Sequence, residues 1–243
     1  MSIQSESEFL ASYDDQRFAR PSLTVDVVLL TAREGHLEVA VKKRSEHPDK
    51  GKWALPGGFV ALDESLETAA FRVVSEKIGI RGVYFEQLYT FGDPHRDPRT
   101  RIVTVAYVGL VSADSLIAEL AAEAKLARIM VPWIGETGGP VSVSDDEGLV
   151  SLAFDHESII AMAVQRLRGK LNYAPIGYQL LPPTFTLRKL QAIHECVLGQ
   201  TLNKDSFRRR MLASGDLAST GEFESEVGHR PAELYRFARQ SAL

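Results

Sequence analysis

The feature that most constrains the fold is the segment 58–80, GFVALDESLETAAFRVVSEKIGI, which joins a glycine-led loop to an amphipathic helix. At about 100° per residue, Phe71, Val74 and Ile78 share one helical face, so we expect that face to pack on a sheet. Positions 73, 76 and 77 lie within roughly 100° of arc on another face. The simplest interpretation of that second face is a solvated surface of a helix.

The spacing of this segment resembles the Nudix box of the Nudix pyrophosphohydrolase family. The residues that fall on the family's positions are Gly58, Glu64, Arg72, Val74, Glu76, Gly79 and Ile80. The preceding LPGGF and Trp53 also match the family. The resemblance implies a helix that converges three carboxylates on Mg²⁺. Val73 and Lys77 replace two of them, and with Glu76 the face has a formal charge of zero, so we expect no catalytic residue, no metal site and no required cofactor.

The rest of the N-terminal part alternates β-rich runs with helical segments. Strands are predicted at residues 23–32, 36–45, 83–92, 100–111 and 149–154. Helices are predicted at residues 113–129 and from Asp155, as an N-cap, to Arg168. Residues 131–143 are expected to form a loop and an edge strand. This order suits an α/β fold of the Nudix type, in which a mixed sheet lies between helices in an α/β/α sandwich.

The C-terminal part has the pattern of a winged helix-turn-helix. Thr186 is a plausible N-cap of a first helix whose buried residues recur at helical spacing, and Gly199 ends it. Asn203 caps a second helix, KDSFRRRMLA, and two β-prone pieces follow. The segment from residue 186 onward contains nine basic and seven acidic residues, although the whole chain has a formal charge of −4. A basic C-terminal module therefore follows an acidic body.

The basic second helix is the predicted DNA-binding element. Phe207 and Met211 define its buried side, and Arg209 points nearly opposite to them. We expect Arg209 and Ser206 to approach base edges, while other residues hold phosphates. The candidate DNA-binding residues are Lys204, Ser206, Arg208, Arg209, Arg210, His229 and Arg230. For the last two, at the hairpin tip, a plain surface turn is an equal alternative.

The combination of a degenerate Nudix box with a winged helix resembles the NrtR family, the Nudix-related transcriptional regulators of NAD metabolism. The motifs that support it are YTFGDPHRDPRTRIVTVAYV at 89–108, FTLRKLQAIHE at 185–195, FRRRML at 207–212 and GHRPAELYRF at 228–237. The resemblance implies a homodimeric repressor that senses ADP-ribose or a related NAD-derived nucleotide and binds operator DNA near NAD biosynthesis or salvage genes. The competing hypothesis is a Nudix hydrolase, similar to ADP-ribose pyrophosphatases, with an accessory C-terminal domain.

Candidate residues for the nucleotide come from the loops and the helix around the box. They are Arg44, Trp53, Gly57, Gly58, Arg72, Glu76, Lys77, Arg96 and Arg99. Arginines suit a diphosphate or ribose, and Lys77 would supply positive charge where Mg²⁺ would sit. Each also admits a structural role: Trp53 packing its loop, Arg72 pairing with Glu64 or Glu76, and the glycines forming the turn.

The predicted organisation has four parts: a flexible lead-in at 1–20, a Nudix-like sensing domain at 21–170, a connection at 171–185 and a winged helix-turn-helix at 186–243. A polar, acidic N-terminus is not a secretory signal, and no apolar run approaches the length of a membrane span. The single Cys196 fits a reducing compartment. We expect a cytoplasmic protein that does not contact a membrane.

Overall fold

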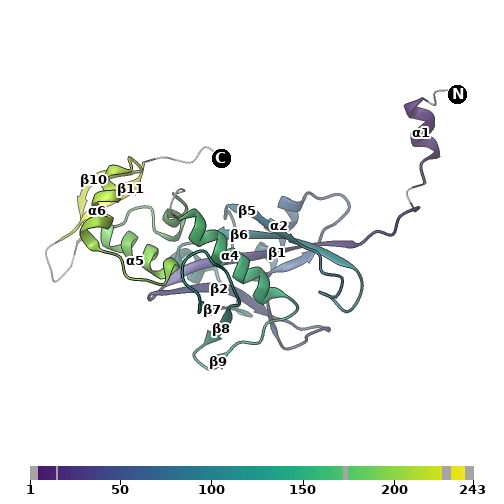
Figure 1. Cartoon of the computed structure of the whole chain (residues 1–243), viewed down its shortest axis with the longest axis horizontal. Helices are drawn as coiled ribbons and strands as arrows, with labels where there is room; N and C mark the ends of the chain where they lie inside the picture. Colours follow the sequence, from purple (N-terminus) through teal and green to yellow (C-terminus); the bar gives the residue numbers. More distant parts are fainter. Residues whose placement is uncertain (1–4, 15, 172–174, 226–230, 239–243) are drawn as a thin grey trace.

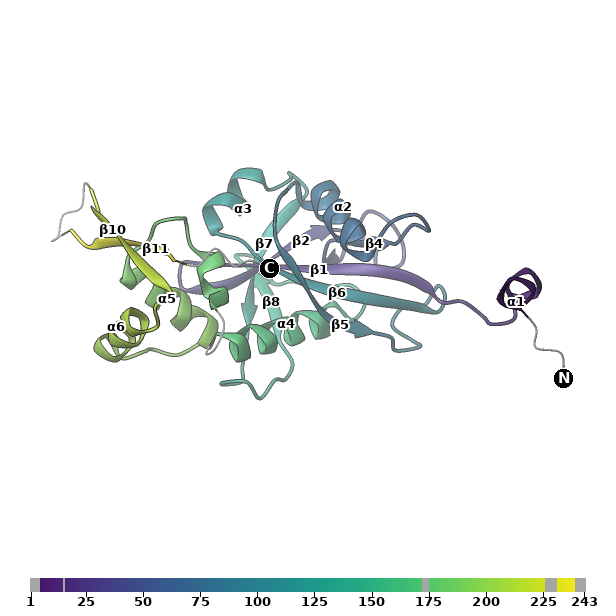
Figure 2. The same ribbon diagram turned by 90° about the horizontal axis from the view of Figure 1, so that it is seen from above.

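The structure is a computed structural model that describes residues 5–14, 16–171, 175–225 and 231–238. Its larger part is a mixed sheet of nine described strands with helices on both faces (Figures 1 and 2). The strands are β1 (Ser22–Arg33), β2 (His36–Lys43), β3 (Trp53–Ala54), β4 (Gly57–Phe59), β5 (Phe85–Phe91), β6 (Ile102–Leu110), β7 (Ala124–Met130), β8 (Ser142–Asp145) and β9 (Gly148–Leu149). The helices of this part are α2 (Leu66–Ile78), α3 (Ala113–Glu119) and α4 (His156–Lys170).

The strand order along the sheet is β5-β6-β1-β2-β7-β8-β9, with β3 paired to β2 and β4 paired to β1. Strand β1 runs parallel to β6 and antiparallel to β2 and β4. A parallel pair needs a long crossover, and here the crossover contains α2 and β5. The mixed sheet between helices confirms the predicted α/β/α sandwich.

Strand β1 is buried on both faces, which explains its nearly continuous apolar sequence. Successive side chains of a strand point to opposite faces. Val25, Val27 and Leu29 therefore join the core under α2, while Val28 and Leu30 join the core under α4. Figure 2 shows α2 and α3 on one side of the sheet and α4 on the other. The sheet and these helices form the frame on which the loops of the site are held.

Helix α2 forms where the sequence predicts it, but its buried face is different from the predicted one. Ser65 caps its start by accepting from the Thr68 amide, and Gly79 ends it with a left-handed φ of 94°. Val73 is completely buried, although its position was assigned to the second face. Phe71 was predicted to be buried, yet it is 47% exposed, with its ring centroid 5.1 Å from that of Phe85. The buried stripe is centred about one residue away from the predicted stripe.

The helix predicted over 113–129 is wrong in its second half. Helix α3 ends at Glu119, and after a short turn the chain continues as β7. Strand β7 pairs antiparallel with β2, for example Val39 with Ala127. Tertiary pairing therefore outweighs the local helical preference of this Ala-rich stretch.

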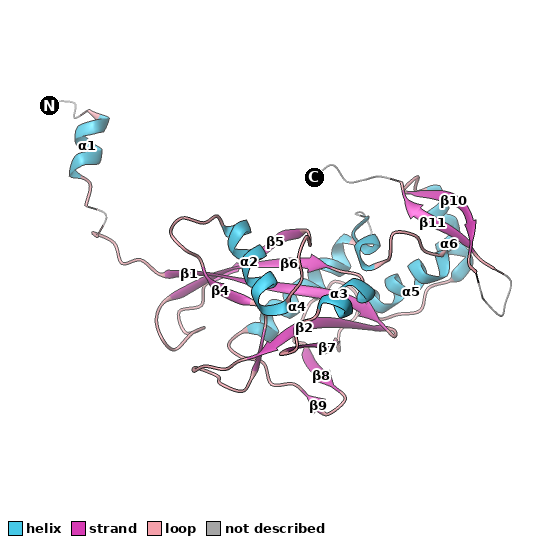
Figure 3. Cartoon of the chain, turned by 180° about the vertical axis from the view of Figure 1, so that it is seen from behind, coloured by secondary structure: helices cyan, strands magenta, loops and turns pink. Residues whose placement is uncertain are grey.

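The C-terminal part contains η1 (Pro175–Leu180), α5 (Leu187–Leu198), α6 (Lys204–Ala213) and the hairpin β10 (Leu217–Phe223) and β11 (Glu233–Phe237). Thr186 and Asn203 cap α5 and α6, and Gly199 ends α5 in the left-handed region, as predicted. Two helices followed by a two-stranded wing confirm the winged helix-turn-helix (Figure 3).

The two parts share one hydrophobic core. The cluster under α4 continues through Leu181 and Phe185 to Leu190, Phe207 and Tyr235. Phe185 also bridges to Tyr235 of the wing through backbone hydrogen bonds of 2.9 and 2.8 Å. The described part of the segment predicted as a connection is thus packed against its neighbours.

Helix α1 (Glu6–Ser12) lies in the predicted lead-in and projects away from the rest of the molecule (Figure 1). It has a capping box at Ser5 and Glu8 and no buried residue. Throughout the described ranges, no helix has the length and apolar character needed to cross a membrane.

Candidate functional site

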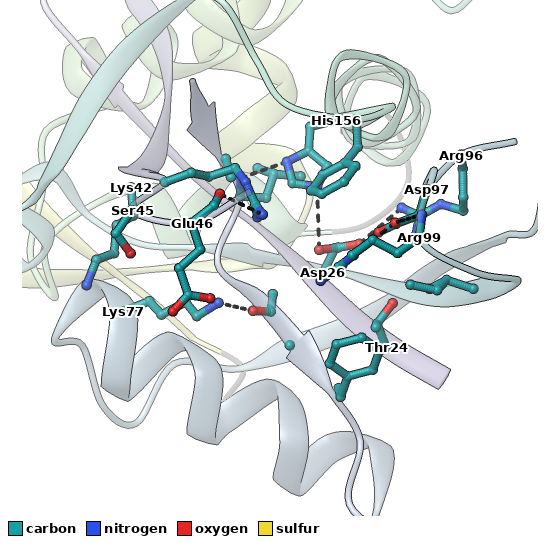
Figure 4. A pocket seen from close by; sticks show the side chains of 18 of the residues that line it. Thr24, Asp26, Lys42, Ser45, Glu46, Lys77, Arg96, Asp97, Arg99 and His156 are labelled. Carbon is teal, nitrogen blue, oxygen red and sulfur yellow. Dashed lines mark hydrogen bonds and ion pairs between the residues drawn. The ribbon is translucent and has the colours of Figure 1, made fainter. Parts of the chain in front are cut away.

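A cavity of about 330 Å³ opens between the end of α2, the start of α4 and the loops around β2, β4 and β6 (Figure 4). Its walls come from β1 and β2, the β3–β4 turn, the end of α2, the loop 93–99 and the first residues of α4. The lining residues are Thr24, Asp26, Lys42, Lys43, Arg44, Ser45, Glu46, Ala54, Leu55, Gly57, Gly58, Phe59, Lys77, Arg96, Asp97, Arg99, Ile102, Phe154 and His156.

The cavity has a positive balance of charge although the whole chain is acidic. Six lining residues are cationic and three are acidic, with His156 as the remaining titratable group. Enclosed walls of low dielectric strengthen the attraction of such a site for anions. Its chemistry therefore suits a ligand with phosphate groups.

Arg96 is the most restrained of the cations. Its side chain is 5% exposed, and it forms a two-pronged ion pair with Asp155, with nitrogen–oxygen distances of 2.9 and 2.7 Å. It also donates to Asp26 at 3.3 Å. Burial alone lowers the pKa of Arg96, but the hydrogen bond to Asp155 and the charge of Asp26 outweigh it and raise that pKa above its usual value. Two carboxylates thus hold the guanidinium in place at the wall of the cavity.

His156 is a buried residue of the cavity lining and is a neutral imidazole. Its Nδ1 accepts from the Leu55 amide at 3.0 Å, which leaves the proton on Nε2, 3.7 Å from Asp26. Burial lowers the pKa of His156, and the Asp26 charge only partly opposes that shift. Its sequence position gave no signal for a role in the site.

Lys77 occupies the region where the Nudix box would carry its last glutamate. Its ammonium donates to the Gly57 carbonyl and faces Asp26. Burial lowers the pKa of Lys77, and the Asp26 charge opposes that shift. Gly57 cannot be replaced here, because an added Cβ would lie 2.0 Å from an Asp26 carboxylate oxygen. A cation of the chain itself therefore lies in the cavity.

The side chains around Lys77 do not fit a divalent cation. Val73 is a buried hydrocarbon whose γ-methyl lies 3.0 Å from the Cβ position of Gly58. Glu76 is exposed and pairs with Arg72 at 3.6 Å. In the part of the chain that the structure describes, no group of three His, Cys, Asp or Glu residues is arranged for a metal ion. Hard cations such as Mg²⁺ prefer several oxygen ligands.

An aromatic wall completes the cavity. Phe154 adopts a left-handed φ of 52°, which is unusual for a bulky residue. The Arg44 guanidinium lies 4.6 Å from the centroid of its ring, and Arg44 is held by the Pro48 carbonyl at 2.9 Å. Arg99 lies 5.6 Å from the Phe59 ring centroid. Stacked arginine and aromatic planes offer surfaces for a base or a ribose.

The structure separates the candidate ligand residues into two groups. Six of them line the cavity: Arg44, Gly57, Gly58, Lys77, Arg96 and Arg99. Trp53, Arg72 and Glu76 do not. Trp53 lies between Lys43 and Lys125, whose ammonium is 3.8 Å from its ring centroid.

Arg72 and Glu76 lie on α2 outside the lining of the cavity. Arg72 instead pairs with Glu64 and donates to the Phe59 carbonyl at 3.0 Å. The role of these two residues in ligand binding stays a prediction. The residues that the sequence did not indicate are Asp26, Phe59, Asp97, Phe154, Asp155 and His156, which the fold gathers from separate strands, loops and α4.

The second candidate surface lies on α6 and carries five exposed candidate residues: Lys204, Ser206, Arg208, Arg209 and Arg210. Phe207 is buried and Met211 partly buried, as predicted. Arg210 lies 5.6 Å from the Phe207 ring centroid, and Arg208 interacts with Glu233 of the wing. His229 and Arg230 lie outside the described residues.

Comparison with known proteins shows that the chain combines a Nudix domain with a following winged helix. Residues 20–134 match the NUDIX domain family, and residues 177–237 match the NrtR DNA-binding winged helix domain family. The chain is 37% identical over 243 residues, covering 99% of this chain and 91% of the relative, to the ADPR responsive transcriptional repressor NtrR of Acinetobacter baylyi. The chain belongs to the NrtR family.

Solved structures agree with this assignment. Shewanella oneidensis NrtR in complex with a 27mer DNA is 35% identical, with a TM-score of 0.73 and coverage of 88% of this chain and 93% of that chain. The NUDIX domain of the same protein in complex with ADP ribose covers 68% of this chain and 99% of that chain at 35% identity, with a TM-score of 0.52. The ADP-ribose pyrophosphatase of Methanocaldococcus jannaschii is 30% identical over 143 residues, covering 59% of this chain and 73% of the relative.

Proposed function

We propose that this chain is a transcriptional repressor that binds operator DNA through its winged helix and responds to ADP-ribose, or a related NAD-derived nucleotide, in the cationic cavity. The observation that carries this proposal is the cavity itself, whose six cations suit a diphosphate. The whole-length similarity to the A. baylyi repressor supports the coupling of such a site to DNA. The regulated genes would be those of NAD biosynthesis or salvage.

The chain binds the nucleotide without hydrolysing it. Hydrolysis in a Nudix box relies on carboxylates that hold Mg²⁺, which polarises the diphosphate and activates water. In this proposal, Val73 and Lys77 replace two of these carboxylates, and Lys77 supplies one positive charge directly to the diphosphate. Hydrolysis of ADP-ribose is the second candidate function, because the chain is 30% identical to the M. jannaschii ADP-ribose pyrophosphatase over 143 residues.

DNA binding rests on α6. Arg209 and Ser206 read base edges in the major groove, while Lys204 and one flanking arginine, Arg208 or Arg210, hold phosphates. A single winged helix is a small interface, so the functional unit is a homodimer joined through the Nudix-like domain. Such a dimer would present two recognition helices about 34 Å apart, one turn of DNA.

A mobility shift tests the proposal directly. The probes are the DNA upstream of the chain's own gene and of its neighbours, with a coding fragment of equal length as control. We expect a retarded complex on one upstream probe, and a change in its apparent affinity when ADP-ribose is added. The proposal would be contradicted if no upstream probe were retarded at salt concentrations at which the control fragment is also unbound.

A further inference from the structure

The first turn of α4 lies against the cavity in an arrangement that an anionic ligand would disturb. Asp155 occupies the N-cap position of α4, where a carboxylate usually accepts from the first amides of a helix. Here it makes no such capping bond, and both of its oxygens accept from Arg96 instead. A phosphate that binds the Nε–Nη2 edge of Arg96 would compete with Asp155, and the released carboxylate would be available to cap the helix.

The residue before Asp155 holds conformational strain. A left-handed backbone is strained for a bulky residue, and such strain persists only when its surroundings impose it. At Phe154 the surroundings are the Asp49 carboxylate, which accepts from the Phe154 amide at 3.0 Å, and the Arg44 guanidinium over the ring. Both Phe154 and Arg44 line the cavity. The entry to α4 is therefore sensitive to what occupies the cavity.

The other end of α4 holds the winged helix. Arg168, 3% exposed, donates to the Val197 carbonyl in the last turn of α5 at 2.8 Å. It also donates to the carbonyls of Trp133 at 2.8 Å and Gly135 at 3.3 Å, and it lies 4.5 Å from the Trp133 ring centroid. Backbone carbonyls, rather than a carboxylate, are thus the acceptors for this buried guanidinium. Asp155 and Arg168 are separated by about 20 Å of continuous helix at 1.5 Å per residue.

The turn after α5 transmits the position of α5 to α6. Glu195 accepts from the Leu202 amide at 2.8 Å and from Gln191 at 3.0 Å, and Gln191 donates to the Leu202 carbonyl at 3.0 Å. These bonds fix the turn that leads to α6 and its arginines. A shift of the last turn of α5 would therefore move α6 as well.

We propose that α4 couples the cavity to the winged helix, with Asp155 as the residue that senses an anion at Arg96 and Arg168 as the contact that passes the change to α5. This inference rests on the proposed function, because it takes ADP-ribose as the anion. When ADP-ribose binds Arg96, Asp155 is released, α4 shifts and the Arg168 contact to α5 loosens. Arg168 is a positioning residue, since it touches neither the cavity nor α6.

Hydrogen–deuterium exchange of the full chain, with and without saturating ADP-ribose, tests this coupling. In the wild type we expect the amides at 196–200 to exchange about fivefold faster or more when ADP-ribose is bound, within the usual range of allosteric coupling. Arg168→Lys keeps the charge but loses the forked contact, so the ligand effect at 196–200 should vanish, and by linkage ADP-ribose should bind up to about fivefold more tightly than to the wild type. Arg166→Lys, on the same helix but bonded to the Leu88 carbonyl of β5, is the matched control and should behave like the wild type.

Asp155→Asn tests the cavity end of α4 in a variant that keeps Arg168. With the competing ion pair weakened, ADP-ribose should bind about tenfold more tightly, and the ligand effect at 196–200 should be lost. Normal ADP-ribose binding with no exchange change at 196–200 in the wild type would overturn the inference and leave the proposed function intact. A ligand effect that persists in Arg168→Lys would also overturn it. Absence of ADP-ribose binding to the wild type would instead overturn the proposed function, and the inference with it.

Discussion

Replacing Lys77 by methionine removes the positive charge that we propose takes the place of a metal ion. Lys77 already donates one N–H to the Gly57 carbonyl, which leaves two donors for a diphosphate. A hydrogen bond to a charged group contributes about 1.5–3 kcal/mol, or about 10- to 150-fold in affinity. Without Lys77, the Asp26 charge also faces the diphosphate with less compensation, so the loss should lie toward the upper end of that range.

The assay is calorimetric titration of ADP-ribose into the full chain with excess EDTA. We expect wild-type binding to survive EDTA, Lys77→Met to bind 10- to 150-fold more weakly, and Lys77→Arg to stay close to the wild type. Lys50→Met removes the same charge from an exposed position outside the cavity and should have little effect at physiological salt. A Lys77→Met affinity within threefold of the wild type, or a wild-type affinity that requires Mg²⁺, would refute the proposed role of Lys77.

Three further outcomes are expected. With Mg²⁺ or Mn²⁺ present, ADP-ribose should be cleaved only at a trace rate, and turnover near one per second or above, measured by product chromatography, would show a working hydrolase. Arg209→Ala should cost about 1–3 kcal/mol on the cognate site and relax specificity, whereas Lys204→Ala should weaken cognate and random DNA alike, as compared by fluorescence anisotropy; identical behaviour would refute the assigned roles. Burial lowers the pKa of His194 from 6.5 to about 4. As the pH falls, the unfolded state therefore binds a proton at this histidine before the folded state does. The free energy of unfolding should consequently fall by up to about 3 kcal/mol between about pH 6.5 and 4. Denaturant titrations should show that the free energy of unfolding falls more over this pH range in the wild type than in His194→Leu. Equal pH profiles of the two proteins would contradict this prediction.

The sequence was sufficient to predict the architecture because its signals are local. Capping residues such as Thr186 and Asn203 and the left-handed Gly199 define the helices of the winged part where they were expected. The main error in the sheet, the missing strand β7, arose because pairing with β2 depends on contacts that are distant in sequence.

The cavity was predicted less completely, for two physical reasons. Helical periodicity gives the faces of α2 only to within about one residue, so it did not show that Lys77 lines the cavity while Arg72 and Glu76 do not. The second reason is that Asp26 and Asp155 come from β1 and the start of α4, and only the fold brings them to Arg96. No local motif marks residues that meet in this way.

The most direct test of a nucleotide-responsive repressor is the reciprocity of its two ligands. Thermodynamic linkage requires that, if ADP-ribose changes operator affinity by some factor, operator DNA changes ADP-ribose affinity by the same factor, typically about 5- to 150-fold. ADP-ribose would be titrated calorimetrically into the full chain, alone and with a saturating amount of the upstream DNA that gives a mobility shift. We predict two affinities that differ by the factor seen in the mobility shift; equal affinities would contradict an ADP-ribose sensor in this chain.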